Sequence, residues 1–471
     1  MTAVAAYDLI AIGSGPAGRC AAIEAAKLGK HAAVVEREAI GGVSTNVGTV
    51  PSKTLRAAVV ELTGQGHGIY RNAYRARHEL TTDDLFWRTH QVIEHEREVI
   101  HDELRRNGVD VIAGSASFVD AHTLRVDVRG SRRLLRSERL VIAVGTKPVR
   151  PRAIDFDDRT VFDSNGILGL AELPRTLTVI GGGVIGLEYA SMAAALGLRV
   201  TLVDRRARLL EFVDGQLVEA LQYHLRGRGV VFRLGEEAVA VERHSGGGAV
   251  TCLLGGERLS SEVVLHAGGR RGATDELDLE AAGLEADRHG RIAVDRDYRT
   301  AQPHIFAVGD VTGFPRLAST AMEQGRRAAL AAFCLAPEGA GVLPFAIYTI
   351  PELSFAGRSE PELIGAAVPY VAGVARYREL ARGEIAGDRS GLLKLLVDAD
   401  SRRILGVHIL GTSATELVHL GQLAITAGLE VDYFVHAVFN APTFAGAYKV
   451  AAIDAANRLA APRSGDAVRA A

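Results

Sequence analysis

The stretch Asp8-Leu-Ile-Ala-Ile-Gly13-Ser-Gly15-Pro-Ala-Gly18 indicates the fold of this 471-residue chain. An apolar run enters three glycines with the spacing GxGxxG, and the helical stretch Arg19 to Leu28 follows. A second apolar run, His31 to Val35, then ends in Glu36. A strand, a glycine turn, a helix and a second strand closed by an acid make the full context of a dinucleotide-binding unit.

The same order recurs in the second half of the chain. The stretch Leu177-Thr-Val-Ile-Gly181-Gly-Gly183-Val-Ile-Gly186 leads into a helical segment that runs to Leu196, and the strand Arg199 to Val203 ends in Asp204. In both copies the acid follows the first glycine at the same spacing. The alternative is a pair of glycine turns on purely structural α/β units, but both copies carry the complete context. We therefore predict that the chain binds two dinucleotides.

Each position of such a fingerprint has a physical task. The first glycine makes the tight turn, the second lets the pyrophosphate approach the backbone, and the third packs the helix against the strand. The helix N-terminus offers unpaired N–H groups to the phosphates, and the closing acid can hold a ribose hydroxyl pair. The predicted contacts are Gly13, Gly15, Pro16, Ala17, Gly18, Glu36 and Arg37 in the first copy and Gly181, Gly183, Val184, Ile185, Gly186 and Asp204 in the second.

Composition limits the class of protein. Hydrophobic residues make up 48% of the chain and charged residues 23%, as in ordinary soluble proteins, and the length suggests roughly three domains. The 54 basic and 56 acidic residues leave a net charge of -2, which gives no field to attract nucleic acid or an anionic membrane. Because no apolar run is long enough to span a bilayer and no signal peptide is evident, we expect a cytoplasmic protein without membrane insertion.

Glycines at the ends of predicted strands also indicate the domain layout. The buried strand Val141 to Val144 ends at Gly145, and its counterpart Val263 to Ala267 runs into further glycines that include Gly269. From about Leu343 the glycine fingerprints stop, and strands followed by helices predict a separate α+β domain. The fold class is therefore α/β, with two Rossmann-like domains and a C-terminal α+β domain.

The region between the first fingerprint and Gly145 has two further patterns. Short alternating runs between Val111 and Val128 predict a β-meander, and Asp84 to Arg106 has the apolar spacing of a long amphipathic helix. His90, Glu94 and His101 fall near one face of that helix and could imitate a metal site. No further element supplies fitting ligands, so we interpret them as a solvated helix face and predict no metal.

Two more segments join the fingerprints in a family resemblance. They are Gly41-Gly-Val-Ser-Thr-Asn-Val-Gly-Thr-Val-Pro-Ser-Lys53 and Ile305-Phe-Ala-Val-Gly-Asp310. With them, nearly the whole chain resembles the FAD-dependent pyridine nucleotide-disulfide oxidoreductases. The resemblance implies that FAD occupies the first fingerprint, a nicotinamide nucleotide the second, and that the C-terminal domain makes a homodimer or a higher homo-oligomer. The implied layout is residues 1–150 and 273–342 for FAD binding, 151–272 for NAD(P) binding and 343–471 for dimerisation.

The resemblance also implies the residues around the flavin. Glu36 would hold the adenosine ribose, Asp310 would hydrogen-bond the ribityl chain, and the amides at the start of the helix from Thr320 to Ala332 would face the pyrimidine ring. Lys53 and Glu188 would pair beside flavin N5, and a buried charge does need such a partner. The remaining implied FAD contacts are Gly42, Ser44, Thr45, Gly48, Thr49, Ser52, Gly145, Leu317, Ala318 and Ser319.

Departures from the family pattern indicate the chemistry. The two redox cysteines of the family fall on Ser44 and Thr49, and its C-terminal acid/base pair of histidine and glutamate falls on Ala441 and Gly446. A hydroxyl neither forms a disulfide nor ionises near neutral pH as a tuned thiol does. Without a thiol to protonate, an imidazole general acid/base has no task. Thiol-disulfide exchange is therefore excluded.

What remains is hydride transfer through flavin N5, from NADPH to NAD+ and back. Within the family the chain is similar to the soluble pyridine nucleotide transhydrogenases, which also have threonine at position 49, and the resemblance implies an enzyme of the Si-specific type. The alternative on the same scaffold is an NAD(P)H:quinone reductase or diaphorase. A third hypothesis, an idle nucleotide-binding subunit that senses NAD(P)H through a partner, is disfavoured because Lys53 and Glu188 are retained.

The tripeptide Asp204-Arg205-Arg206 bears on cofactor choice. An acid at this strand end favours the free 2′-hydroxyl of NAD(H), whereas arginines suit the 2′-phosphate of NADP(H). An acid beside two arginines could accept both nucleotides, with Arg206 the preferred phosphate ligand and Arg205 the second. A solvated charged turn is the alternative. The backbone at Gly269 completes the predicted nucleotide contacts.

Overall fold

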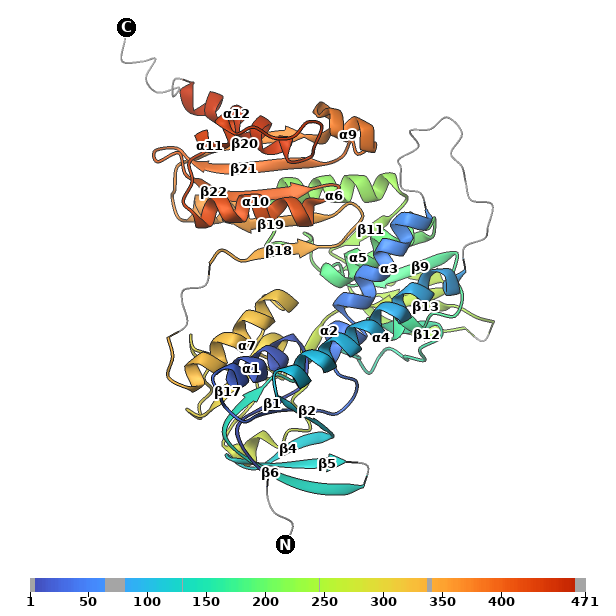
Figure 1. The fold of residues 1–471 in the computed structure, drawn as a ribbon. Helices are drawn as coiled ribbons and strands as arrows, with labels where there is room; N and C mark the ends of the chain where they lie inside the picture. The colour runs from blue at the N-terminus through green and yellow to red at the C-terminus, as the bar shows by residue number, and fades with distance from the viewer. Residues whose placement is uncertain (1–4, 64–80, 129, 245, 337–340, 462–471) are drawn as a thin grey trace.

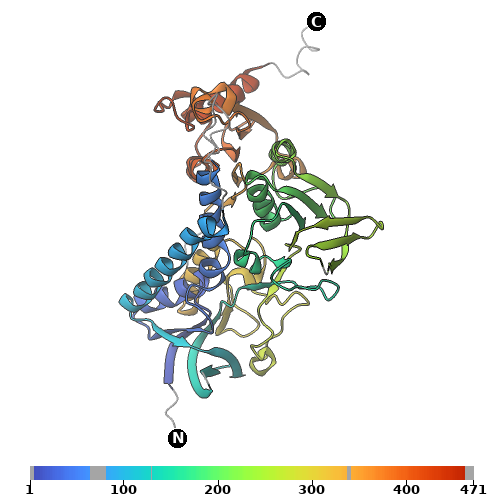
Figure 2. The same cartoon turned by 90° about the vertical axis from the view of Figure 1, so that its right-hand side faces the viewer.

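The computed structural model describes residues 5–63, 81–128, 130–244, 246–336 and 341–461. In Figure 1 the first body lies at the end of the molecule near the N-terminus and the third at the end near the C-terminus, with the second body to one side between them. The side view in Figure 2 shows the second body projecting from the column that the first and third bodies form.

The first body is built on a seven-stranded sheet. Its strands are arranged in the order β3-β2-β1-β6-β5-β4, and β17 pairs with the far end of β6. The strands are β1 (Ala5–Ile12), β2 (Ala32–Glu36), β3 (Asp110–Ala113), β4 (Ser115–Asp120), β5 (Thr123–Val128), β6 (Ser131–Ile142) and β17 (Ile305–Ala307). The helices are α1 (Pro16–Lys27), α2 (Gly42–Asn46), α3 (Thr49–Leu62), α4 (Thr82–Arg106) and α7 (Ala318–Ala332), with the 3₁₀ turns η2 (Leu279–Ala282) and η3 (Gly309–Thr312).

The predicted meander begins later than the sequence indicated. The strand that contains Val111, β3, pairs parallel with β2 and so belongs to the nucleotide-binding sheet. The antiparallel meander is β4-β5-β6, in which the first part of β6 pairs with β5 and its second part lies between β1 and β17. Alternation alone could not separate the two, because Gly114, at φ +151°, makes only a one-residue break between β3 and β4.

The second body repeats the parallel sheet. Its five strands are arranged in the order β11-β10-β9-β15-β8, all parallel. They are β8 (Val161–Asp163), β9 (Thr176–Ile180), β10 (Arg199–Asp204), β11 (Val231–Leu234) and β15 (Val263–His266), with η1 (Gly166–Gly169), α5 (Val184–Ala195) and α6 (Gly215–Gly227). An antiparallel sheet adds β12 (Ala238–Arg243), β13 (Ala249–Leu253) and β14 (Arg258–Ser261), and β7 (Thr146–Pro148) pairs with β16 (Arg270–Gly272) where the two bodies are connected.

The third body is an antiparallel sheet covered by helices. The strand order is β18-β19-β22-β21-β20. The strands are β18 (Pro344–Ile347), β19 (Leu353–Gly357), β20 (Tyr370–Arg376), β21 (Leu392–Asp398) and β22 (Ile404–Leu410). The helices are α8 (Glu360–Gly365), α9 (Ala381–Ala386), α10 (Ala414–Thr426), α11 (Asp432–His436) and α12 (Gly446–Ala460), with the turn η4 (Tyr377–Glu379).

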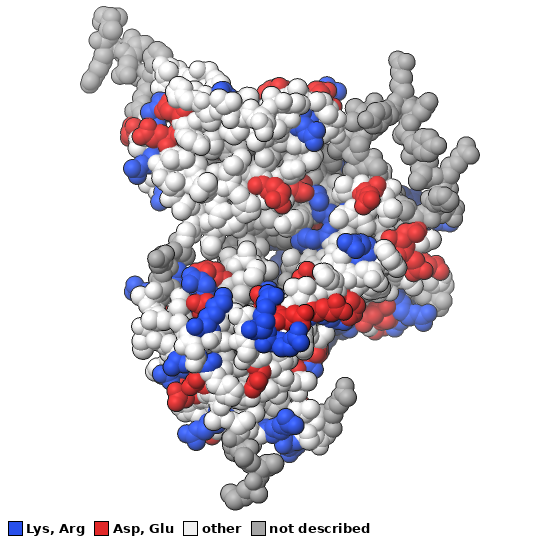
Figure 3. Space-filling view, viewed as in Figure 1, with Lys and Arg blue, Asp and Glu red and all other residues white. Residues whose placement is uncertain are grey.

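The surfaces of the three bodies differ in character. On the face shown in Figure 3, acidic and basic side chains are mixed over the lower part, whereas much of the upper body is uncharged. The third body also exposes large apolar side chains along its last three helices and the loop after α11. They are Leu420, Leu423, Tyr433, Val438, Val450 and Ile453. Within the described residues, no helix is both long and apolar enough to cross a bilayer.

Close packing of α1 against α7 fixes the flank of the first sheet. A side chain at Gly325 of α7 would place its Cβ 2.0 Å from the carbonyl oxygen of Ala17 in α1. Only glycine permits this approach, because the neighbouring atom is backbone and cannot turn aside.

We expect the substitution Gly325→Ala to lower the free energy of unfolding by about 1–3 kcal/mol, since α7 must move away from α1. Gly227→Ala, at the end of α6 where a Cβ meets nothing within 4 Å, is the control and should be neutral or slightly stabilising. Urea unfolding of both variants measures the difference. Equal stability of the two variants would contradict the packing argument.

Candidate functional site

The first fingerprint forms a tight junction between β1 and α1. Gly13 has φ +102°, and a Cβ at Gly18 would lie 1.9 Å from the carbonyl oxygen of Gly13. The helix starts after Gly15 without any side-chain cap, so the N–H groups of its first turn have no partner from a capping side chain. The glycines leave room for a ligand, and the free amides suit a phosphate.

The acid after β2 closes back onto this junction. Glu36 accepts hydrogen bonds from the backbone N–H and the hydroxyl of Ser14, at 2.9 and 2.6 Å, and from the N–H of Glu38 at 3.0 Å. The Ser14 hydroxyl oxygen in turn accepts from the N–H of Gly41 at 2.9 Å. The predicted ribose acid is thus held at the mouth of the glycine turn, while Arg37 forms surface ion pairs with Glu38 and Glu276.

The second fingerprint repeats the geometry. Gly181 has φ +107°, and a Cβ at Gly186 would lie 1.8 Å from the carbonyl oxygen of Gly181. Helix α5 starts after Gly183 with no side-chain cap, so Val184, Ile185 and Gly186 present their amides as in the first copy. Asp204 accepts from the N–H of Gly182 at 2.6 Å. Both turns therefore fit a pyrophosphate.

The acid of the second copy has an additional partner that the sequence did not reveal. The Arg206 guanidinium donates to both carboxylate oxygens of Asp204, from Nε at 2.9 Å and from Nη2 at 2.7 Å. Burial acts to raise the pKa of Asp204, but the hydrogen bonds from Arg206 and Gly182 outweigh it and hold that pKa below its ordinary value. Arg205 is exposed beside this pair. Arg206 therefore contacts the predicted ribose acid, although its side chain is also 43% exposed to solvent.

The segment from Gly41 to Lys53 of the first body has hydroxyl side chains at the two positions where the family has cysteine thiols. Ser44 lies in the short helix α2, and Thr49 is the first residue of α3. Gly42 approaches the first fingerprint, since its Cβ would lie 3.0 Å from the Cα of Gly15. Thr45 and Ser52 are buried, and the glycine before α3 is Gly48.

The described free cysteines are Cys20, Cys252 and Cys334. Cys20 is the one in the first body's glycine-turn helix, α1, and burial raises the pKa of its thiol. A raised thiol pKa disfavours the nucleophilic thiolate, which fits a packing role.

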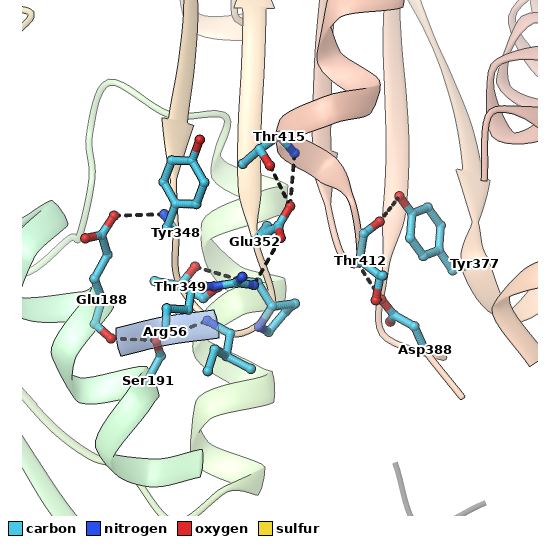
Figure 4. A network of polar contacts seen from close by, with 12 residues as sticks. Arg56, Glu188, Ser191, Tyr348, Thr349, Glu352, Tyr377, Asp388, Thr412 and Thr415 are labelled. Carbon is cyan, nitrogen blue, oxygen red and sulfur yellow. Dashed lines mark hydrogen bonds and ion pairs between the residues drawn. The ribbon is translucent and has the colours of Figure 1, made fainter. Parts of the chain in front are cut away.

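The ion pair expected from the sequence is present. Lys53 Nζ lies 2.9 and 2.7 Å from the two carboxylate oxygens of Glu188, which joins α3 of the first body to α5 of the second. The Glu188 side chain is only 5% exposed, so a charge that has left water meets its counter-ion. Figure 4 shows Glu188 at the junction with the turn that follows β18. Their role at a flavin remains a prediction.

Another carboxylate lies after β17, at the same edge of the first sheet as the first fingerprint, since a Cβ at Gly309 would lie 3.2 Å from the Cβ of Ala17. Asp310, in η3 after Gly309 (φ +76°), is 3.4 Å from the Thr146 hydroxyl, which follows Gly145 (φ +63°). Burial raises the pKa of Asp310, and Arg270 and Arg316 only partly offset that rise. A buried acid with few hydrogen bonds can receive a hydroxyl donor, as a ribityl chain would offer.

Arg270 and Thr146 also lie in this region and were not predicted from the sequence. The Arg270 guanidinium donates to the Thr146 hydroxyl and carbonyl oxygens at 3.0 and 2.8 Å and to Asn165 at 2.9 Å. The sequence does mark Arg270, because it directly follows Gly268 and Gly269, the counterpart of Gly145 in the second half of the chain. Gly269, at φ +145°, lies at this second turn, before β16.

Helix α7 begins near these groups. Its N-cap is Leu317, which makes no side-chain cap hydrogen bond, so the first amides of the helix, from Ala318 and Ser319, are free to face a ligand. The helix dipole places partial positive charge there.

The three residues of α4 that could imitate a metal site do not form one with other side chains among the described residues. His90, Glu94 and His101 are all exposed on α4. Among residues 5–63, 81–128, 130–244, 246–336 and 341–461, no group of three or more histidine, cysteine or acidic side chains could hold a metal ion.

Comparison with known proteins supports the resemblance. The family model described as pyridine nucleotide-disulphide oxidoreductase matches residues 7–325, and the model of that family's dimerisation domain matches residues 343–452. The soluble pyridine nucleotide transhydrogenase of Mycobacterium tuberculosis (strain ATCC 25177 / H37Ra) is 51% identical over 460 residues, which cover 97% of this chain and 98% of the relative. That of Hahella chejuensis is 41% identical over 468 residues, with 96% and 99% covered.

Solved structures share the architecture. The chain is similar to LpdA from Mycobacterium tuberculosis, with a TM-score of 0.88 and 25% identity, over 97% of this chain and 100% of that one. It is also similar to RclA from Escherichia coli, a flavoprotein disulfide reductase induced by HOCl, with a TM-score of 0.83 and 27% identity, over 95% and 99% of the two chains.

The raised pKa of Asp310 makes a pH dependence testable in the flavin-free protein. An acid whose pKa is raised by folding stabilises the protein below its unfolded pKa, about 3.9, and loses that contribution as pH rises through the folded value. We therefore expect Asp310→Asn to be more stable than the wild type at pH 7, with a gap that closes toward pH 4.

Denaturant unfolding of the flavin-free proteins at several pH values measures this gap. Asp120→Asn is the control, because a backbone hydrogen bond from His122 lowers the pKa of the exposed Asp120, and its loss should act in the opposite direction. A less stable Asp310→Asn variant at pH 7 would show that the ionised carboxylate is satisfied in the fold.

Proposed function

The chain belongs to the pyridine nucleotide-disulphide oxidoreductase family, and from this membership we propose that it is an FAD-dependent NAD(P)+ transhydrogenase, moving hydride reversibly from NADPH to NAD+. The observation that carries this conclusion is the active-site segment, which keeps the Lys53–Glu188 ion pair but has Ser44 and Thr49 in place of a redox disulfide. Its relatives at 41–51% identity are named soluble pyridine nucleotide transhydrogenases.

FAD, when bound, supplies an acceptor that can take a hydride from one nicotinamide and return it to another. The chain's own residues provide binding and orientation. The amides of α1 and the Glu36 carboxylate would hold the pyrophosphate and the adenosine ribose of FAD, and Asp310 its ribityl hydroxyls. The amides of α5 and the Asp204–Arg206 pair would hold the nicotinamide nucleotide.

The Lys53 ammonium would lie at the reacting end of both ligands. A positive charge there stabilises negative charge that develops as a hydride arrives, and Glu188 keeps that charge in place. Neither direction of transfer needs a side-chain proton donor. This agrees with Ala441 and Gly446 at the positions of the family's acid/base pair.

The same proposal includes the finer assignments. Transfer is of the Si-specific type, the protein acts in the cytoplasm, and the domain limits are residues 1–150, 151–272, 273–342 and 343–471. The third body forms the homodimer contact, which its exposed apolar helices and mostly uncharged face support.

An anaerobic experiment tests the function. We expect NADPH to bleach the flavin absorbance of the purified holoenzyme and NAD+ to restore it rapidly, because the chain holds no thiol relay that would compete. If only a quinone restores the colour, the protein is a quinone reductase and the transhydrogenase proposal fails.

The Asp204–Arg206 pair makes a separate prediction about nucleotide choice. Arg206→Ala removes a charged hydrogen-bond donor to a 2′-phosphate, so KM for NADPH should rise about 10-fold or more. KM for NADH should stay constant or fall, because Asp204 is then free for a ribose hydroxyl. Arg205→Ala, which alters the neighbouring exposed arginine, is the control with the smaller effect. Equal changes for NADPH and NADH would remove Arg206 from the phosphate site.

A further inference from the structure

Three elements, not two, meet at the Lys53–Glu188 pair. The third is the turn from Tyr348 to Glu352, which links β18 to β19 and belongs to the third body. The Tyr348 N–H donates to Glu188 Oε1 at 2.9 Å, and the Tyr348 ring lies 4.9 Å from Lys53 Nζ. Each member of the pair thus has one contact to this turn.

The turn is also fastened to the helix that carries Glu188. The Ile350 N–H donates to the Ser191 hydroxyl at 3.1 Å, and that hydroxyl donates to the carbonyl oxygen of Glu188 at 2.8 Å. Ser191 is buried, so these bonds are shielded from water. A shift of the turn would therefore act on the Glu188 carboxylate through the Tyr348 N–H and on the backbone of α5 through Ser191.

Arg56 holds the turn from the opposite side. It lies on α3, three residues after Lys53, and donates from Nε to the Thr349 carbonyl oxygen at 3.0 Å, while Nη2 lies 3.1 Å from Glu352 Oε1. Figure 4 shows the Arg56 side chain directed at the turn between Thr349 and Glu352. The side chains of Arg56 and Glu352 are only 16% and 14% exposed, so the pair is little screened by solvent.

The other end of Glu352 is anchored in the third body. Its Oε2 atom accepts hydrogen bonds from the N–H and the hydroxyl of Thr415, at 3.1 and 2.9 Å, at the start of α10. Arg56 is therefore bound to a carboxylate that cannot swing freely. The contacts form a closed path from Lys53 through α3, Arg56, the turn and Glu188 back to Lys53.

We propose that Arg56 is a positioning residue for hydride transfer, acting through the 348–352 turn on the Lys53–Glu188 pair. This inference rests on the proposed function, because it takes that pair as the group that faces the reacting atoms. Misplacement of an oriented group by about 1 Å can cost about 100-fold in rate. A lysine could not replace Arg56, since a single ammonium does not reproduce the fork that bonds a carbonyl and a carboxylate together.

The test compares Arg56→Lys and Arg56→Met with the wild-type holoenzyme. We expect flavin reduction at saturating NADPH to slow about 10-fold or more, with a nearly unchanged half-saturating NADPH concentration, because the nucleotide's adenosine end is held at Asp204. The flavin midpoint potential should fall in both variants, since the Lys53 charge is then less firmly held. Arg402→Met removes the two-bond contact with Asp432, within the third body but away from the turn, and is the matched control.

A double-mutant cycle with Glu188→Gln separates positioning from general destabilisation. If Arg56 acts through the pair, Arg56→Met should have little further effect once Glu188 is Gln. Additive losses, or an unchanged potential and rate with only a lower Tm, would overturn the proposal. Glu352→Gln, which keeps the side chain's shape, should reproduce the loss in a smaller degree and serves if Arg56→Met does not fold.

The two proposals fail differently. Reoxidation by NAD+ in the wild type tests the transhydrogenase, whereas the Arg56 comparison uses only reduction by NADPH and the potential. If NADPH reduces the wild type but NAD+ does not reoxidise it, the transhydrogenase proposal fails. The role of Arg56 in flavin reduction by NADPH can still be measured.

Discussion

The buried carboxylate of Glu188 is a point at which one side chain contacts all three bodies. It takes two hydrogen bonds from Lys53 and one from the Tyr348 N–H, so one side chain joins α3, α5 and the turn after β18. A charge this far from water is tolerated only while its partners stay in place. The ion pair therefore depends on the relative placement of the first two bodies, because separating them would leave Glu188 and Lys53 without each other.

Loss of the family's reactive groups is consistent with this arrangement. Ser44, Thr49, Ala441 and Gly446 remove thiol and imidazole chemistry, but none of them contributes to the Glu188 contacts. The contacts of Glu188, which the proposed function places at the nicotinamide and the flavin, do not depend on the positions that would process a disulfide. A chain could therefore lose the second function and keep the first.

Much of this could be predicted from the sequence, for definite physical reasons. The glycine spacings imply backbone approaches that the structure shows at Gly18 and Gly186, because no other residue fits 1.8–1.9 Å from a carbonyl oxygen. The Lys53–Glu188 contact was implied by the family resemblance, and the rule that a buried charge needs a partner supported it. What escaped prediction depends on contacts between distant segments: the parallel pairing of β3 and the hold of Arg56 on the 348–352 turn. Periodicity describes one element at a time and gives no information on such contacts.

The two fingerprints share one pattern of backbone hydrogen bonds and differ in the charge of one side chain. In each copy the closing acid accepts an N–H from the residue after the first glycine and another from the residue two positions beyond the acid itself. That last residue is Glu38 in the first copy and Arg206 in the second. The two copies thus share their hydrogen bonds but carry side chains of opposite charge at the last position. If the proposed function holds, the first copy would keep one cofactor in place, and the second would accept carriers that differ by a phosphate.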